Sequence, residues 1–300
     1  MRRLPARLAG VAVVVVAATA CAWLLFHLLR PGLFAGEDRS LPRYLERAFL
    51  HFDFGRSEQG SQRPVADLIR EGFPADVSVL LGGLVFGLTA GVGGAIWCAR
   101  RPRGWGSRLV QAAAMAAMCA PVYVVGLMAL LLFGVDIAVV PLGVGIPLRY
   151  VDFDHSPWGW LGALIVPWIV LGLPLAAMCL RVMLGQMVEI GSEDYVRAAR
   201  AKGLTESAVL RRHVAPAALA PTTMLAGSAM PLLITNVVLI EKVFSVPGVF
   251  RDLTQSIGTA NTTLILGMTA VGAFLIAITT LLFDLVLLWL DPRVRAGAAS

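Results

Sequence analysis

Six long apolar stretches constrain this chain more than any other feature of its sequence. They run approximately over residues 8–29, 75–99, 109–133, 159–180, 223–242 and 263–289. An α-helix needs roughly 20 apolar residues to cross the hydrocarbon core of a bilayer, and each stretch is about that long. Only 15% of the residues are charged, whereas soluble domains carry about 25%. The sequence therefore predicts an all-α, polytopic membrane protein with six transmembrane helices.

The first stretch follows a basic start, MRRLPAR, and resembles a cleaved signal in that respect. It is as long as a membrane span and lacks a clear small-residue cleavage site. We therefore predict a retained helix over 8–29 and an extracytoplasmic segment up to residue 74. Within that segment, LPRYLERAFLHFDFG predicts a short amphipathic helix at the outer surface, and an unstructured loop is the alternative.

The distribution of Arg and Lys predicts the orientation of the spans. Fifteen of the 25 basic residues lie in the N-terminal tail, the 100–108 loop, the segment from Arg181 to Arg212, and the C-terminal tail 291–300. The 30–74 segment is balanced in charge, and the 136–154 loop is acidic. We therefore expect both termini to face the cytoplasm. Orientation also accounts for the net charge of +6, so no nucleic-acid partner is expected.

A polar segment, residues 184–221, separates the fourth and fifth predicted spans, and we call it the polar loop. Its sequence SEDYVRAARAKGLTESAVLRRHVAPAALAP, from residue 192 onward, is typical of two short helices that meet at Gly203. Ser192 is the expected N-cap of the first helix, with Asp194 at the positive end of the helix dipole and Lys202 at the negative end. Gly203 is expected to take the left-handed conformation that ends this helix.

The second helix of the polar loop has its own start signals. Thr205 is a suitable N-cap, and Leu204 and Val209 have the spacing of a hydrophobic staple. Pro216 either limits this helix or is accommodated as a kink. Two short helices with clear start and stop signals, placed between apolar spans, predict a docking site for another protein.

Small and polar residues inside the spans predict packing and possible sites. Gly83, Gly87 and Gly91 recur every four residues, a spacing that lets another helix approach closely. Ionisable and polar groups at membrane depth are functional candidates by default. The candidates are few, namely Gln111, Asn236, Glu241, Lys242 and Asp284. We expect Asp284 to be wetted or paired, and Glu241 and Lys242 to lie at the outer end of their span.

The sequence lacks the residue patterns of several enzyme classes. The two lysines follow Ala201 and Glu241, so neither belongs to a phosphate-binding Walker A loop, which needs glycine before its lysine. The four histidines are isolated and form no HExxH motif. Ser57 lacks the second glycine of a hydrolase nucleophile elbow. We therefore expect no catalytic residue, no metal site and no cofactor bound by this chain.

The polar loop resembles the cytoplasmic EAA loop of ABC-transporter permeases, in the form used by the dipeptide, oligopeptide and nickel group. Ala198, Ala199 and Gly203 match the core of that motif, and Arg197 takes its glutamate position. FGRSEQGSQRPVADLIREGFP, VVLIEKVFSVPGVFRDL and LDPRVR resemble further segments of the B-type subunit. The chain departs from the family at Ala217, where asparagine is common, and at the TANTT sequence after Gly258.

The resemblance implies a type I ABC importer permease fold, with the five-helix core over 75–290, in the inner or plasma membrane of a bacterium or archaeon. It implies a C-type permease partner, two cytoplasmic ATPase subunits that use ATP and Mg²⁺, an extracytoplasmic solute-binding protein, and membrane lipid. The implied cargo is a di- or oligopeptide, with nickel or another small solute as the alternative. The residues expected to couple to the ATPase are Asp194, Tyr195, Arg197, Ala198, Ala199, Arg200, Ala201, Lys202, Gly203, Leu204, Arg211, Arg212 and His213.

Three other functional classes stay open on the sequence. A secondary transporter would need an ion site in the bundle, and its transport would persist without a partner ATPase. A membrane enzyme would need a nucleophile or a metal site. A scaffold without transport activity would leave uptake intact when the chain is deleted.

Overall fold

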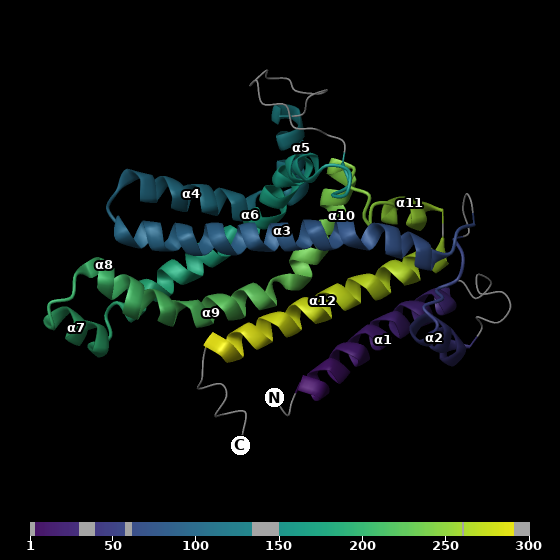
Figure 1. The fold of residues 1–300 in the computed structure, drawn as a ribbon, viewed down its shortest axis with the longest axis horizontal. Coiled ribbons are helices and arrows are strands. Elements are labelled where there is room, and N and C mark those ends of the chain that lie inside the picture. The colour runs from purple at the N-terminus through teal and green to yellow at the C-terminus, as the bar shows by residue number, and fades with distance from the viewer. Residues whose placement is uncertain (1–3, 30–39, 58–61, 134–149, 260, 291–300) are drawn as a thin grey trace. The chain divides into compact units, whose positions relative to one another are not determined.

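The structure is a computed structural model that describes residues 4–29, 40–57, 62–133, 150–259 and 261–290. Over these residues the chain is helical, and the β pairing is a single antiparallel bridge between Arg56 and Pro64. Figure 1 shows the elements in chain order: α1 Leu4–Leu29, α2 Leu41–Leu50, α3 Val65–Arg100, α4 Trp105–Cys119, α5 Val122–Phe133, α6 Pro157–Ile190, α7 Asp194–Ala201, α8 Glu206–Val209, the π-helix η2 Leu210–Val214, α9 Ala215–Ser228, α10 Met230–Phe244, α11 Leu253–Gly258 and α12 Thr262–Leu290.

The chain divides into two compact units, and three helices pass from one to the other. Unit 1 combines Met1–Ser78 with Val237–Leu281, and unit 2 combines Val79–Asn236 with Leu282–Ser300. The helices shared between the units are α3, α10 and α12.

Unit 1 contains the amphipathic helix that the sequence predicts after the first span. α2 buries Tyr44 and Ala48 on one face and packs against α1. Pro42 stands in its first turn, where the missing N–H is not needed by the helix. The segment between the first two spans is therefore ordered over the residues described, and its predicted position at the outer surface stays a prediction.

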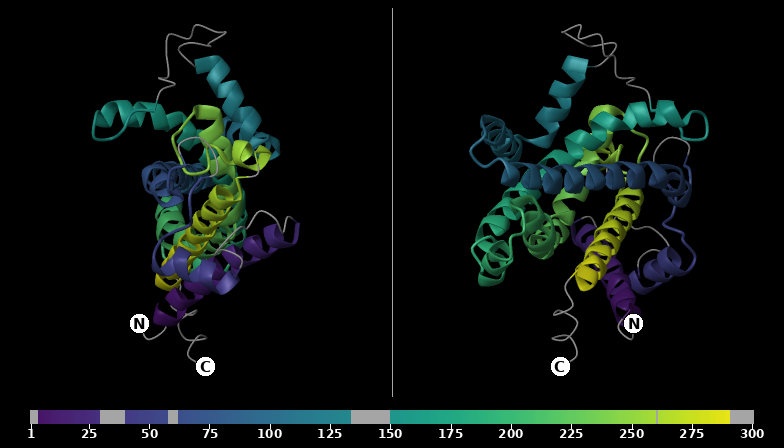
Figure 2. Two further views of the ribbon diagram at one scale, coloured as in Figure 1. Left: turned by 90° about the vertical axis from the view of Figure 1, so that its right-hand side faces the viewer. Right: turned by 60° about the vertical axis from the view of Figure 1, so that its left-hand side comes forward.

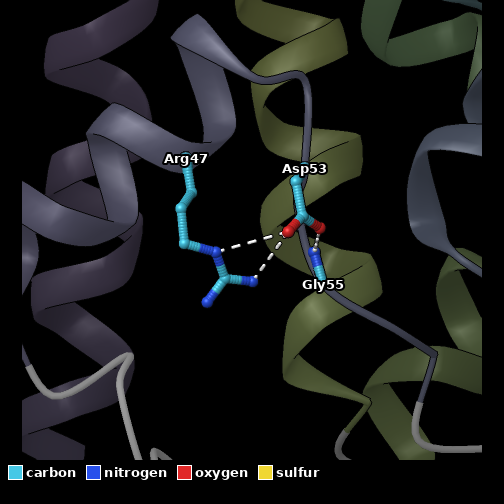
Figure 3. Close-up of polar contacts among 3 residues, drawn as sticks. All are labelled: Arg47, Asp53 and Gly55. Carbon is cyan, nitrogen blue, oxygen red and sulfur yellow. Dashed lines mark hydrogen bonds and ion pairs between the residues drawn. The ribbon is translucent and has the colours of Figure 1, made fainter.

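A tight turn follows α2 and is fixed by one carboxylate (Figure 3). Asp53 Oδ2 accepts from Arg47 Nη2 at 3.0 Å and from Arg47 Nε at 3.3 Å, while Asp53 Oδ1 accepts from the Gly55 N–H at 2.9 Å. The pKa of Asp53 lies below its ordinary value, chiefly because of the Gly55 N–H and further because of Arg47. Phe52 has a φ of 53° and Gly55 a φ of 92°, so the chain reverses through two left-handed residues.

The start of α12 is tied to the segment after this turn. Asn261, which is only 2% exposed, donates from Nδ2 to Ser57 Oγ at 2.8 Å and accepts at Oδ1 from the Leu264 N–H at 3.3 Å. Because each buried polar group finds a partner, this long-range contact stabilises unit 1 instead of costing desolvation energy.

In unit 2, the other helices pack mainly against α6. This helix packs against α4, α5 and α9, and against the C-terminal part of α3. Pro167 and Pro174 lie inside α6 and are tolerated there within an otherwise apolar, largely buried helix.

The six predicted spans all fall on helices, but two of them fall on bent pairs. Among the residues described, α1, α3, α6 and α12 are long and apolar enough to cross a membrane by themselves. The span expected over 109–133 is instead α4 and α5, bent by 113°, and the span over 223–242 is α9 and α10, bent by 52°. The number of candidate spans is therefore four, or up to six if each bent pair is one span.

Proline chemistry explains the sharper bend. Ala120, between α4 and α5, has extended backbone with φ −80° and ψ 127°. The residue before a proline is driven out of the helical region by the proline ring, and Pro121 follows directly. The span predicted over 109–133 is thus a pair of helices bent at Pro121, and its crossing of the membrane as one span stays a prediction.

Some predicted features lie outside the described residues. They are Arg2, Arg3, the positions 136–149 of the acidic loop, Arg293 and Arg295 with the rest of the tail 291–300.

Candidate functional site

The polar loop lies at one end of unit 2, where two long helices end (Figures 1 and 2). α6 has 34 residues and is about 51 Å long at 1.5 Å per residue. This exceeds the roughly 30 Å of a hydrocarbon core, and α3 with 36 residues exceeds it too. The last two turns of α6, over 184–190, already belong to the polar loop, so these helices are long enough to carry the loop beyond a membrane.

The two short helices of the polar loop are α7 and α8. α8 has Thr205 as its N-cap, whose Oγ1 accepts from the Ala208 N–H at 3.4 Å. Between the helices Gly203 has a φ of 81°, the left-handed conformation that its position in the sequence predicts. A Cβ at Gly203 would meet no atom within 4 Å, so backbone conformation, not lack of space, favours glycine here.

The predicted N-cap of α7 is wrong by one residue. The N-cap position is occupied by Glu193, whose side chain makes no capping bond. Ser192 Oγ instead donates to the Glu189 carbonyl at 2.7 Å, at the end of α6. A serine hydroxyl competes for nearby backbone groups, and here the preceding helix provides the nearer partner.

Arg200 holds the two short helices and the end of α6 together. Its Nε and Nη2 donate to both carboxylate oxygens of Glu206, at 3.0 and 2.9 Å, and its Nη1 donates to the Gly191 carbonyl at 2.8 Å. The Arg200 hydrogen bond lowers the pKa of Glu206 below its ordinary value, and the Glu206 bond raises the pKa of Arg200. We call Arg200, Glu206 and Gly191 the arginine clamp. Arg200 is thus already engaged within the loop.

The inner side of the polar loop is apolar and packs on the ends of α3 and α6. Val196 and Val209 are fully buried, and Val214 is nearly so. They share a cluster with Ala95 of α3 and with residues of α6. Burying a valine side chain contributes roughly 1.5–3 kcal/mol, so the cluster fixes the loop to the helices beneath it. Ala199, one of the predicted coupling residues, is 6% exposed and belongs to this inner cluster, and Leu204 packs against it.

The outer side of the polar loop carries most of the residues that the sequence proposes for coupling. Tyr195 is 49% exposed, and Arg197 pairs with Asp194 one turn earlier on the same exposed face. The exposed set is Asp194, Tyr195, Arg197, Ala198, Arg200, Ala201, Lys202, Gly203, Arg211 and Arg212. We call this set the outer face. On this surface, alanine and glycine residues lie between the charged side chains of Asp, Arg and Lys residues.

Pro216 does not end the second helix, because the chain widens into a π-helix before it. η2 spans Leu210–Val214 and leads directly into α9, with Pro216 in the first turn of that helix. A proline removes one backbone donor and crowds the preceding turn, and a π turn gives it room. The exposed Arg211 and Arg212 and the half-buried His213 all lie on this turn.

The three glycines of the predicted seam lie against α6. The Cβ atom that each lacks would come within 2.7 or 2.8 Å of α6, the nearest side chains being Leu171, Leu175 and Cys179 in turn. On α6 itself, a Cβ at Gly172 would lie 2.3 Å from the Gly83 carbonyl oxygen. Gly83 and Gly87 thus lie against Gly172, and Gly91 lies against Ala176 and Cys179, so this contact excludes larger side chains on both helices.

One buried ionisable residue escaped the sequence analysis. Asp76 lies in α3 and is fully buried, as is Glu241 of α10, which was expected at the outer end of its span. The sequence offers one weak signal for Asp76, a carboxyl group just inside the edge of the span predicted over 75–99. Among the residues described, no three His, Cys, Asp or Glu side chains are placed to hold a metal ion.

Comparison with known proteins assigns the family. Residues 91–296 match the family described as binding-protein-dependent transport system inner membrane component. A Brucella abortus protein whose name designates it a peptide transport system permease is 34% identical over 248 residues, which cover 82% of this chain and 76% of that protein. The dipeptide transport system permease protein DppB of Lactococcus lactis is 30% identical over 243 residues, covering 81% of this chain and 76% of the relative.

The matched residues include α4 to α12 and thus the whole polar loop. Such permeases are multi-pass proteins of the cell membrane, in agreement with the apolar helices found here. The chain belongs to the family of inner-membrane components of binding-protein-dependent transport systems, as a permease subunit of the ABC peptide-transporter family.

Proposed function

We propose that this chain forms half of the translocation pathway of an ATP-driven importer of di- or oligopeptides, and that its polar loop receives motion from a cytoplasmic ATPase. The observation that carries the coupling role is the construction of the loop. Its inner side is packed on α3 and α6, and its outer face is exposed. The names of the relatives support peptides as the cargo.

The outer face suits insertion into a groove of a partner. Ala198 and Ala201 allow close approach, and Tyr195 offers a large side chain for burial at an interface. Lys202, Arg211 and Arg212 are available for acidic groups of the partner. Arg200 is better assigned to the arginine clamp, because both edges of its guanidinium are already used.

The rigid inner packing suggests how motion passes into the spans. Closure of the ATPase pair, which ATP and Mg²⁺ drive in those subunits, would push on the outer face. The cluster around Val196 and Val209 would pass that displacement to α3 and α6 as a rigid body. The seam at Gly83, Gly87 and Gly91 would let these two helices move together.

The remaining partners follow from the same proposal. A homologous C-type permease would complete the pathway, and an extracytoplasmic binding protein would deliver the solute. The polar loop and both termini would then lie in the cytoplasm, in agreement with the placement of the basic residues.

Substitutions at two neighbouring alanines distinguish a role in docking from a role in folding. Ala198 is exposed and Ala199 is 6% exposed, so the same substitution meets different surroundings. We expect Ala198→Leu to leave the thermal stability of the purified complex unchanged but to lower substrate-stimulated ATP hydrolysis and uptake at least tenfold. Ala199→Leu should lower the stability itself by about 1–3 kcal/mol through overpacking. Full uptake with Ala198→Leu would contradict the docking role.

Uptake in a strain that lacks other peptide importers tests the cargo. Labelled di- and oligopeptides should enter only when this chain and its partner subunits are expressed. Nickel uptake that depends on the chain, with no peptide uptake, would favour the alternative cargo.

A further inference from the structure

Two buried carboxyl groups meet in unit 1, far from the polar loop in sequence. Asp76 of α3 and Glu241 of α10 both have an exposed fraction of 0%. Asp76 Oδ1 accepts from the Val249 N–H at 2.9 Å, in the segment that joins α10 to α11. Among the residues described, the second oxygen of Asp76 and both oxygens of Glu241 accept no hydrogen bond of normal geometry, although the backbone N–H groups of Phe250 and Arg251 lie near Glu241.

Gly248 shows how close the two carboxyl groups are. A Cβ at this residue would lie 2.2 Å from Asp76 Oδ1 and 2.4 Å from Glu241 Oε1. The separation of those two oxygens cannot exceed the sum of these distances. Gly248 is not among the described glycines of positive φ, so the carboxyl groups, not the backbone conformation, exclude a side chain here.

Two ionised carboxylates are not stable in this arrangement. A buried charge costs several kcal/mol unless it is paired, and two like charges in contact add repulsion. The cations and the acid of the adjoining segment do not compensate them, because Lys242, Arg251 and Asp252 are all exposed. Among the residues described, neither carboxyl group forms an ion pair. Binding of one proton would neutralise one carboxylate and so remove the repulsion between the two buried charges.

We propose that Asp76 and Glu241 form a proton-binding site in which the two carboxyl groups share one proton. Asp76 already accepts a backbone N–H, which favours its ionised form, so Glu241 holds the proton and donates it to the second oxygen of Asp76. The pair then fastens the segment between α10 and α11 to α3. This segment contains Ser245 with a φ of 54°, a conformation that non-glycine residues rarely adopt.

Removal of the proton should release this fastening. We expect the melting temperature of the purified complex to fall as pH rises above the ordinary carboxyl range, because the folded pair holds a proton that the unfolded chain releases. Glu241→Gln keeps the size and the donor but cannot ionise, so the difference between wild type and this variant should grow with pH. Asp252→Asn removes an exposed acid from the same segment and is the matched control, with the pH response of wild type.

Infrared spectroscopy and the effect of added cations on stability provide two further tests. Infrared spectra of the wild-type complex at neutral pH should show the carbonyl band of a protonated carboxyl group, which the Asp76→Asn/Glu241→Gln double variant lacks. The presence or absence of this band in the wild-type complex tests the shared proton even if Glu241→Gln and the double variant fail to assemble. A wild-type complex without that band, or one that Na⁺ or Ca²⁺ stabilises only when Glu241 is present, would overturn the shared proton in favour of no proton or a bound cation.

Discussion

The polar loop of unit 2 and the carboxyl pair of unit 1 treat charge in opposite ways. In the loop, Arg200 and Glu206 are 39% and 69% exposed and meet in a two-pronged ion pair. In the pair, Asp76 and Glu241 are fully buried, and both are acidic residues. Exposed ion pairs contribute little, about 0.2–1 kcal/mol, whereas a buried uncompensated charge costs several.

This difference separates two roles for ionisable residues in one membrane protein. In the loop, Arg200 and Glu206 orient the short helices, while Lys202, Arg211 and Arg212 are available to a partner. Loss of these charges should therefore change coupling more than folding. The carboxyl groups of unit 1 hold three segments of chain together, so changes there should affect folding first.

Gly248→Ala should have the largest effect. The added methyl group would lie 2.2 Å from Asp76 Oδ1 and 2.3 Å from Glu241 Cδ, so one carboxyl group has to move. We expect a loss of about 3 kcal/mol in the free energy of unfolding or failure to assemble, because overpacking of a tight site costs this much. Thermal unfolding of the complex measures it.

Gly258→Ala is the control for that prediction. A Cβ at this residue of α11 would meet no atom within 4 Å, so the variant should be as stable as wild type. Equal stability of both alanine variants would show that the carboxyl groups do not crowd Gly248.

Gly203→Ala should have an intermediate effect, restricted to the polar loop. An alanine in the left-handed conformation costs roughly 1–2 kcal/mol, and the β-branched Gly203→Val costs more. We expect both to uncouple ATP hydrolysis from uptake while membrane insertion stays normal. The control Gly185→Ala is in α6, where alanine meets no clash and has the better helix propensity. Normal uptake with Gly203→Val would argue against a rigid elbow at this residue.

Arg200→Gln should have the smallest effect on stability, about 1 kcal/mol or less. Because the folded-state pKa of Glu206 is lowered below 4.5, the ion pair stabilises the loop at pH values above 4.5 and is lost as pH falls through the lower, folded value. Hydrogen exchange of the α8 amides should therefore accelerate in acid for wild type and be fast at neutral pH for the variant. Equal hydrogen-exchange protection of the α8 amides in wild type and Arg200→Gln at neutral pH would show that the arginine clamp does not stabilise the loop.

Local sequence signals predicted much of this architecture. Apolar length placed each predicted span on a helix or on a bent pair of helices, and the left-handed Gly203 and the cap at Thr205 followed from residue type and spacing. Two local departures from the expected helices have a physical cause in a residue nearby in the sequence. Ser192 bonds backward to Glu189 instead of capping α7, and Pro121 drives Ala120 out of the helix.

The carboxyl pair shows what local reasoning does not reach. Asp76 stands at the predicted edge of a span, where a charged residue is ordinary. Its burial depends on Glu241 and on Val249, which lies 173 residues further along the chain. Similarly, the split between the buried Ala199 and the exposed Ala198 depends on how α7 packs against α3 and α6, which the motif itself does not specify.

Photocrosslinking tests the central claim, that the outer face of the polar loop docks on an ATPase. A photoreactive phenylalanine analogue replaces Tyr195, which is 49% exposed on α7, or Trp158, which is 83% exposed at the opposite end of α6. We expect the analogue at position 195 to crosslink to the ATPase subunit in the assembled complex, and the analogue at position 158 not to do so. Capture of the ATPase from position 158, with none from 195, would contradict it.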